Sequence, residues 1–277
     1  MTHEHALRDV SLARQPVWYL PHGGGPCFFM DWNPPDAWDA MKRFLQGIPG
    51  RLPQRPKAIV CVSAHWIETS FGISSGEQPG LIYDYYGFPQ HTYQLRYPAS
   101  GAPWLAERMA ALLDQAGIPA KQHPTRGFDH GMFIPLKVIF PEADVPVVQL
   151  SLLTGLDPEA HFQAGRALAP LRDEGVMIMG SGMSFHNMRG YGDPGFGPIS
   201  DAFDAWLAIT VEAEATLRAE RLFHWEQAPA ARLCHPPRAE EHLLPLMLIA
   251  GAARADHGQC VFTDRVMETT LSAFRFG

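Results

Sequence analysis

A short apolar run from Lys57 to Ser63 (KAIVCVS) limits most strongly what this chain can fold into. It is rich in β-branched residues and has no alternation with polar residues, which is typical of a strand covered on both faces. Further candidate strands lie at 16–20, 70–74, 145–150 and 175–179. Helical spacing and helix-end signals are found at 36–45, 102–116, 158–172, 199–220 and 240–253. This alternation predicts an α/β fold with a central, mostly parallel (mixed) β-sheet flanked by helices.

The length and composition favour a single globular domain. The chain has 277 residues, of which 46% are hydrophobic and 18% charged, so that a large core can be buried. It contains no internal repeat and no flexible linker between domains. We therefore predict a flexible, polar N-terminal segment at residues 1–15 and one domain at residues 16–277.

The charge and the cysteine pattern exclude several classes of partner. The chain has 29 acidic and 22 basic residues, a net charge of −7, and no basic run that would attract nucleic acid or an anionic membrane. No apolar stretch approaches the roughly 20 residues that span a bilayer, and the N-terminus lacks the apolar region of a signal peptide. We expect a cytoplasmic protein without nucleic-acid or membrane partners, and make no prediction of its oligomeric state. Four scattered cysteines fit a reducing compartment: Cys27, Cys61, Cys234 and Cys260.

Five histidines occur in rigid local settings, inside glycine-rich turns or next to apolar runs: His22, His65, His130, His186 and His242. Imidazole is the commonest metal ligand in proteins, and it transfers protons near neutral pH. His22, His65 and His186 follow three of the predicted strands, and the carboxyl ends of parallel strands meet at one edge of a sheet. The pattern therefore predicts a mononuclear metal centre with acid–base groups beside it. The histidines expected to be structural are His91, His123, His161, His224, His235 and His257.

A serine-hydrolase motif is also present, but it lacks the required context. Residues 72–76 (GISSG) match G-x-S-x-G, and HGGG at 22–25 resembles an oxyanion-hole turn. A nucleophile elbow needs a helix directly after the serine. Ser74 is followed by EQPG at 77–80, which cannot begin a regular helix. We therefore assign no nucleophile to Ser74.

Six segments together resemble one enzyme family. They are HGGGP at 22–26, SAHW at 63–66, YGFP…YQLRYPASG at 86–101, FDHGMFIPL at 128–136, GSGMSFHN at 180–187 and EEHLLPL at 240–246. Their order is similar to that in the DOPA 4,5-dioxygenase-like branch of the class III extradiol ring-cleavage dioxygenases, the LigB-type superfamily. The resemblance extends from about residue 16 to residue 253 and implies that residues 16–277 form a catalytic domain.

The resemblance implies a role for each of the five histidines. His22, His65 and His242 correspond to the metal ligands of the family. His186 corresponds to the acid–base catalyst and, in a zinc-loaded form, to a fourth ligand. His130 corresponds to a second catalytic histidine that holds substrate or oxygen. The implied cofactor is Fe(II), bound as in other non-haem oxygenases, and the isolated protein could carry Zn(II) instead.

The implied activity is that of an oxidoreductase that opens the aromatic ring of a catechol-type, DOPA-like substrate with O₂. Three alternatives remain open at this point. Glu241 could replace its neighbour His242 as ligand, because the wider superfamily uses a glutamate there. The same histidines could serve a zinc-dependent hydrolase, or a metal-binding protein without turnover. Candidates to line the pocket are Tyr85, Tyr86, Phe88 and Tyr93, and candidates to bind an anionic group are Arg96, Arg126 and Arg189.

Overall fold

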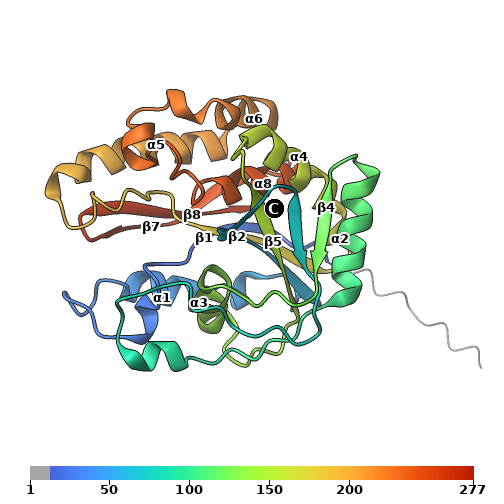
Figure 1. The fold of residues 1–277 in the computed structure, drawn as a ribbon. Helices are drawn as coiled ribbons and strands as arrows, with labels where there is room; N and C mark the ends of the chain where they lie inside the picture. The colour runs from blue at the N-terminus through green and yellow to red at the C-terminus, as the bar shows by residue number, and fades with distance from the viewer. Residues whose placement is uncertain (1–12) are drawn as a thin grey trace, which may run out of the picture.

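The apolar run at 57–63 forms the first part of strand β2 (Ala58–Glu68), which lies between two parallel neighbours. In the computed structural model, which describes residues 13–277, these neighbours are β5 (Val147–Leu153) and β6 (Val176–Gly182). Strand β1 (Val17–Pro21) pairs in parallel with the other side of β6. Helices cover both faces of all four strands (Figure 1), and this burial explains why apolar residues predominate in their sequences.

Antiparallel pairs extend the sheet on both sides. Strand β3 (Phe71–Ser74) joins β5 antiparallel and pairs in parallel with β4 (Ala120–His123). On the other side, the hairpin of β7 (Gly258–Val266) and β8 (Thr269–Phe276) joins β1 through β8. The strand order is β4-β3-β5-β2-β6-β1-β8-β7, so the predicted α/β fold with a mixed, mostly parallel centre is confirmed.

The helices form a layer on each face of the sheet (Figure 1). One layer contains α1 (Asp39–Gln46) and α3 (His130–Ile139). The other contains α4 (Pro158–Leu168), α5 (Gly197–Glu212), α6 (Ala215–Phe223) and α8 (Leu244–Ala253). Helix α2 (Pro103–Gln115) packs against β3 and β4, and α7 (Ala231–Cys234) is a single turn near α5.

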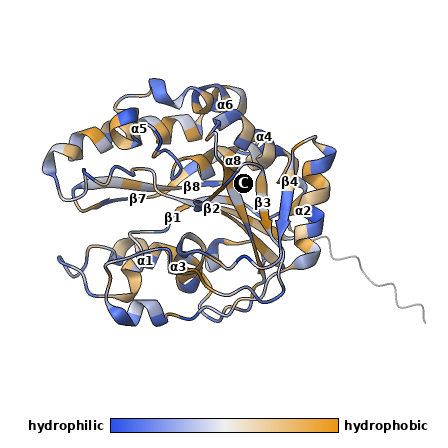
Figure 2. Ribbon diagram, in the orientation of Figure 1, coloured by the Kyte–Doolittle hydropathy of each residue, from blue (hydrophilic) through white to orange (hydrophobic). Residues whose placement is uncertain are grey.

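Helix α8 is the centre of the second layer. All ten of its residues are buried, and it packs against β6, β1 and α4. Figure 2 shows hydrophobic residues gathered in the sheet and on the helices that face it, whereas the edge strand β4 is hydrophilic. A helix that is apolar on all sides is stable in water when it is enclosed in this way. The segment that leads into α8 is therefore held firmly against the sheet.

Among the predicted elements whose boundaries differ in the structure, three differ most. The strand predicted at 57–63 continues to Glu68, so that His65 lies within β2 and does not follow it. The helix predicted at 199–220 is two helices, because Ala213 is extended and the Glu214 side chain caps α6 by accepting a hydrogen bond from the Thr216 N–H. The helix predicted at 240–253 begins at Leu244, next to Pro245, so His242 lies in the turn before it and not in its first turn.

The predicted flexible segment at 1–15 lies, except for residues 13–15, outside the described residues. Gln15 is buried, and its N–H donates to the Arg172 carbonyl oxygen at 3.1 Å. The Arg172 side chain donates in return to the Gln15 carbonyl oxygen at 2.8 Å. Within residues 13–277, no helix is long and apolar enough to cross a membrane.

Candidate metal centre

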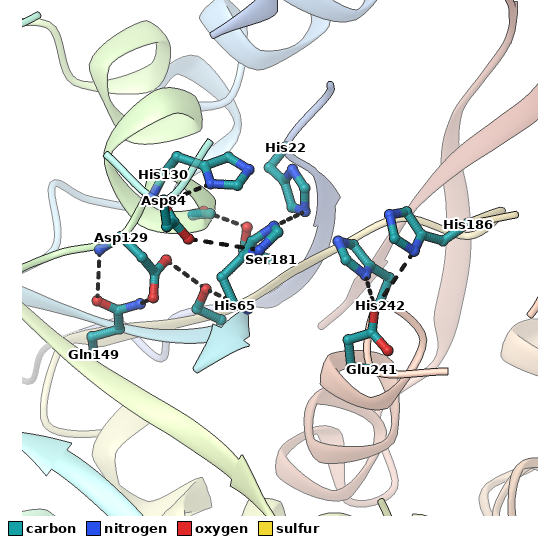
Figure 3. Close-up of polar contacts among 12 residues, drawn as sticks. His22, His65, Asp84, Asp129, His130, Gln149, Ser181, His186, Glu241 and His242 are labelled. Carbon is teal, nitrogen blue, oxygen red and sulfur yellow. Dashed lines mark hydrogen bonds and ion pairs between the residues drawn. The ribbon is translucent and has the colours of Figure 1, made fainter. Parts of the chain in front are cut away.

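A cavity of about 390 Å³ lies at the carboxyl ends of β1, β2 and β6. This is the edge at which open α/β sheets bind ligands. The structure brings all five histidines singled out in the sequence to this cavity: His22, His65, His130, His186 and His242. Figure 3 shows how they face one another although they come from different elements. The five side chains that were predicted to converge thus lie around one cavity.

His22 follows β1 directly and is buried. Its Nδ1 lies 2.8 Å from the Gly23 carbonyl oxygen, so Nδ1 carries the proton and Nε2 keeps a free lone pair. The His22 N–H donates to the Gly182 carbonyl oxygen of β6 at 3.2 Å. The turn needs glycine at position 23, because its φ of 82° lies in the left-handed region. The backbone therefore directs His22 Nε2 into the cavity.

His65 lies in a bulge of β2. Between Val62 and Ile67 the strand advances five residues, while its partner β5 advances only two, from Leu150 to Leu152. Extra residues of this kind locally redirect side chains, often next to active sites. His65 Nε2 points to His22 Nε2 at 3.3 Å, and its Nδ1 lies 3.7 Å from a carboxylate oxygen of Asp84.

His242 comes from the turn before α8, on the far side of the cavity. Its carbonyl oxygen accepts hydrogen bonds from the Tyr19 hydroxyl (2.7 Å) and the Met183 N–H (3.1 Å), which tie the turn to the sheet. A Cβ atom at Gly182 would lie 2.0 Å from the same oxygen, so the close approach requires glycine. His242 Nδ1 is 2.9 Å from Glu241 Oε1, and its Nε2 is buried without a hydrogen-bond partner in the described part of the chain.

These three histidines fit a metal ion. Ligand atoms of His22, His65 and His242 all lie within 4.8 Å of one another. Metal–imidazole bonds of about 2.0–2.1 Å would place two nitrogens on one ion about 3.0–3.4 Å apart, and those of His22 and His65 are 3.3 Å apart. Burial, followed by the neighbouring histidines, lowers the pKa of each of the three well below its ordinary value. The neutral imidazole so favoured is the form that binds metals.

An oxygen atom close to Nδ1 of each ring supports the same assignment. These atoms are the Gly23 carbonyl oxygen and the carboxylates of Asp84 and Glu241. Partners of this kind orient histidine ligands and raise their basicity. Glu241, the alternative ligand, thus lies on the Nδ1 side of His242, whereas the unpartnered Nε2 is the atom available to an ion.

His130 is held by Asp84. It begins α3, and both its Nδ1 (2.8 Å) and its backbone N–H (3.0 Å) bond to Asp84 Oδ1. Burial raises the pKa of Asp84, but the bonds to His130 outweigh this effect, so that this pKa lies below its ordinary value. Asp84 is thus a carboxylate between His130 and His65. Asp84 was not predicted from the sequence, because it lies in an irregular aromatic segment in which only the tyrosines and Phe88 were considered as candidates.

His186 stacks on His242, with ring centroids 3.3 Å apart and ring planes at 17°. Its Nδ1 lies 3.6 Å from Glu241 Oε1. Burial, and to a smaller extent the electrostatic interaction with neighbouring His130, lowers the pKa of His186 to about 4. His186 is therefore a neutral imidazole at the cavity wall at neutral pH, beside the group of three and close to a carboxylate.

The charged residues proposed to bind an anionic substrate do not reach the cavity. Arg126 donates to the buried Asp129 carboxylate at 3.3 Å and stacks on the Trp66 ring at 4.2 Å. Asp129 also accepts hydrogen bonds from the Ser63 hydroxyl at 2.7 Å and from the Gln149 side chain. Arg96 and Arg189 do not line the cavity either. Of the aromatic candidates, Tyr85, Tyr86 and Phe88 line it, whereas Tyr93 packs behind Tyr85.

The remaining motifs have structural roles. Ser74 is buried in β3, its hydroxyl accepts a hydrogen bond from the Gln149 N–H at 2.7 Å, and an irregular loop follows it, so G-x-S-x-G forms no nucleophile elbow. The six histidines expected to be structural do not line the cavity. Among them, His161 and His235 are buried and bonded to backbone atoms.

Comparisons with known proteins agree with this geometry. Residues 18–274 match the family described as the catalytic LigB subunit of aromatic ring-opening dioxygenase. The chain is 42% identical to the 4,5-DOPA dioxygenase extradiol of Portulaca grandiflora, over 84% of each chain. It is 36% identical to the protein of that name in Escherichia coli K12, over 89% of each chain. It is also 36% identical to the dioxygenase tasH of Hapsidospora irregularis, over 95% of this chain and 85% of that one.

The fold has a solved counterpart as well. A crystal structure of an uncharacterized protein from Escherichia coli K12 superimposes with a TM-score of 0.77 at 30% identity, covering 95% of this chain and 100% of that one. The family match favours ring-opening oxygen chemistry over the hydrolase and the non-enzymatic protein that the histidine pattern left open. The chain belongs to the LigB family and is an extradiol aromatic ring-opening dioxygenase.

Proposed function

We propose that the protein opens a catechol-type ring next to its diol, with O₂ and one Fe(II) ion held by His22, His65 and His242. The observation that carries this assignment is the convergence of the three imidazoles, with the buried Nε2 of His242 left without a hydrogen-bond partner among residues 13–277. Fe(II) held by these three histidines would supply a redox-active Lewis acid for the reaction of the catechol with O₂, whereas Zn(II) has no accessible redox change.

The remaining histidines handle protons and orientation. His186 is neutral at pH 7 because its pKa is about 4, so it can accept a proton from a catechol hydroxyl. Glu241 Oε1, 3.6 Å from His186 Nδ1, stabilises the charge that His186 then acquires. Asp84 fixes the proton of His130 on Nδ1, which leaves Nε2 as an acceptor for the second hydroxyl.

The wall of the cavity around the reacting groups is mostly apolar. Trp32, Trp38, Tyr85 and Phe88 surround the histidines with aromatic surface. In such an enclosure the interactions between charged groups are stronger than in water. The predicted product is a ring-opened semialdehyde, which is yellow. The names of the relatives make L-DOPA the first substrate to try.

Oxygen uptake by reconstituted protein tests the proposal. Metal-stripped protein is loaded anaerobically with Fe(II) and given L-DOPA and a panel of other catechols, while absorbance follows the product. We expect O₂ consumption matched by a yellow ring-opened product. No uptake with any catechol by fully iron-loaded protein would reject the proposed reaction. Turnover by rigorously iron-free, zinc-loaded protein would reject Fe(II) as the working metal.

We also propose, from the cysteine pattern alone, that the protein is cytoplasmic. Cell fractionation with an antibody against the chain tests this point. Recovery in a membrane or secreted fraction would contradict it.

A further inference from the structure

The cavity wall beyond the histidines has a distinctive composition, and this bears on the substituent of the catechol, given the function proposed above. The wall is formed by aromatic rings and thioethers, among them Trp32, Trp38, Phe88, Met183 and Met267. Within residues 13–277, no Lys, Arg, Asp or Glu side chain lines it. A cavity of about 390 Å³ lies in the range of roughly 300–1,000 Å³ that small-molecule sites have, so it accommodates more than a single bound ring.

Two large apolar side chains stand at the mouth of this cavity. Tyr86, in the loop after Asp84, is 91% exposed, and Met188, two residues after His186, is 70% exposed. Both line the cavity, Tyr86 two residues after Asp84 and Met188 two residues after His186. When a ligand covers apolar side chains beside its cavity, apolar surface is removed from water, and this makes the free energy of binding more favourable. The apolar surface thus continues from the inner wall to solvent.

Among the side chains of residues 13–277 that line the cavity, a charged substituent would find no Lys, Arg, Asp or Glu as counter-charge. Arg126 is paired with Asp129 and does not line the cavity, and Arg189 is exposed and does not line it either. The nearest carboxylates, Asp84 and Glu241, are bonded to His130 and His242. An ammonium or carboxylate moved into this wall would lose its hydration without gaining a partner, which is unfavourable.

We propose that the preferred substrate is a catechol with an uncharged, apolar substituent, such as an alkyl or aryl group, and not an amino-acid catechol. The diol lies at the histidines, and the substituent extends along Trp32 and Trp38 toward Tyr86 and Met188. This inference separates the chain from relatives whose names specify DOPA.

A matched series of catechols tests the inference. Fe(II)-reconstituted protein is assayed by oxygen uptake with 4-butylcatechol, 3-(3,4-dihydroxyphenyl)propionate, dopamine, L-DOPA and catechol itself. We expect kcat/KM for 4-butylcatechol to exceed that for each charged analogue by about tenfold or more, because two buried methylene groups alone contribute about that factor. A charged analogue that is preferred tenfold would overturn the inference and leave the ring-opening function intact.

A binding measurement separates this inference from the reaction. Quenching of tryptophan fluorescence by each catechol, with zinc-loaded protein under argon, gives dissociation constants without turnover. We expect 4-butylcatechol to bind about tenfold more tightly than L-DOPA. If no catechol is opened but this ranking holds, the proposed reaction fails and the inferred apolar site stands. Equal or tighter binding of L-DOPA overturns the inference.

Variants at the mouth locate the selectivity. Tyr86→Ala and Met188→Ala should each lower the ratio of kcat/KM for 4-butylcatechol over catechol by about threefold or more. Ile209→Ala is the matched control, since Ile209 is 63% exposed on α5 and lies outside the cavity. Arg189→Ala should leave the ratio unchanged. A tenfold rise in the KM of L-DOPA alone in that variant would show that Arg189 binds the carboxylate, and would overturn the inference.

Discussion

His186 and His242 stack face to face with ring centroids 3.3 Å apart, and Glu241 Oε1 lies within 3.6 Å of Nδ1 of both rings. Two imidazolium rings at this distance would repel each other, so they do not both carry a second proton. The arrangement fits two different roles, in which His242 binds the metal and His186 exchanges a proton beside it. Substitution of the two residues should therefore have different effects.

Removal of a proposed ligand should release the metal. We expect His22→Ala, His65→Ala and His242→Ala to lower the metal content of Fe(II)-reconstituted protein at least about tenfold. Loss of a residue that binds the metal lowers metal affinity more than loss of a residue that only hydrogen-bonds to a ligand. His186→Ala should retain the metal and lose most turnover, by about 10²–10⁴-fold. Metal analysis after gel filtration and oxygen uptake measure the two effects.

His224→Ala serves as the control for these variants, because His224 is exposed at the end of α6 and does not line the cavity. It should keep both metal and turnover. Equal metal loss in His186→Ala and His242→Ala would identify His186 as a further ligand and remove its assignment as the proton acceptor.

Asp84→Asn should weaken the site without removing a ligand. Asp84 bonds the side chain and the N–H of His130 and faces His65, and an amide cannot accept both bonds with the strength of a carboxylate. Loss of a partner of this kind costs about 10–100-fold in metal affinity or activity. Metal titration and kcat measure it, with the exposed Glu77→Gln as the control. A variant with unchanged affinity and kcat would show that Asp84 is dispensable.

Much of this site could be predicted from the sequence, because local signals mark the ends of the buried strands. The apolar run before His65 has no polar alternation, and the glycines after His22 leave few backbone alternatives. The convergence then follows from parallel topology. Asp84 gave no such signal, since its contact with His130 spans 46 residues and depends on the path of an irregular loop.

The parts of the fold that the sequence did not predict contain polar residues at buried positions. Strand β8 is almost wholly buried but contains Thr269, Thr270 and Ser272, so it does not read as an apolar run. Its polar groups are satisfied by partners far along the chain, such as the Ser184 hydroxyl that accepts from the Ser272 N–H at 2.8 Å. The bulge that places His65 inside β2 likewise depends on pairing with β5, which no local pattern encodes.

Gly182→Ala should disturb two proposed ligands at once. The new Cβ would lie 2.0 Å from the His242 carbonyl oxygen, a backbone atom, and the Gly182 carbonyl accepts the His22 N–H. We expect a loss of about 1–3 kcal/mol in the free energy of unfolding, together with weaker metal binding. Urea denaturation and metal analysis test this. At Gly50→Ala, no atom of residues 13–277 beyond the two chain neighbours lies within 4 Å of the new Cβ, so this variant should change stability by less than about 0.5 kcal/mol. Similar effects of the two substitutions would contradict the steric argument.

Stability should fall as pH drops, in part because of His161, which is remote from the metal centre. Burial lowers the pKa of His161 to about 4, and its Nε2 accepts a hydrogen bond from the Leu153 N–H. The unfolded chain, with an ordinary pKa near 6.5, binds the proton more readily. The contribution of neutral His161 to the free energy of unfolding is therefore complete above about pH 6.5. It is lost as the pH falls toward 4, and the loss amounts to about 3 kcal/mol.

The difference between wild type and His161→Gln isolates this effect from that of the other buried histidines. Urea denaturation at pH 7 and pH 5 should show a smaller loss of stability in the variant. An identical loss in both proteins would mean that His161 is already neutral in the unfolded chain or is protonated without cost in the native one.

The three proposed ligands are distributed over most of the chain, since His22 and His242 are 220 positions apart (242 − 22). During synthesis the first two emerge from the ribosome long before the third. A nascent chain that ends before residue 242 presents a two-nitrogen site at most, and releases a metal ion easily. Firm retention of the metal therefore begins after the last helix has docked, so the metal content of a preparation also measures the fraction of molecules that are complete and correctly folded.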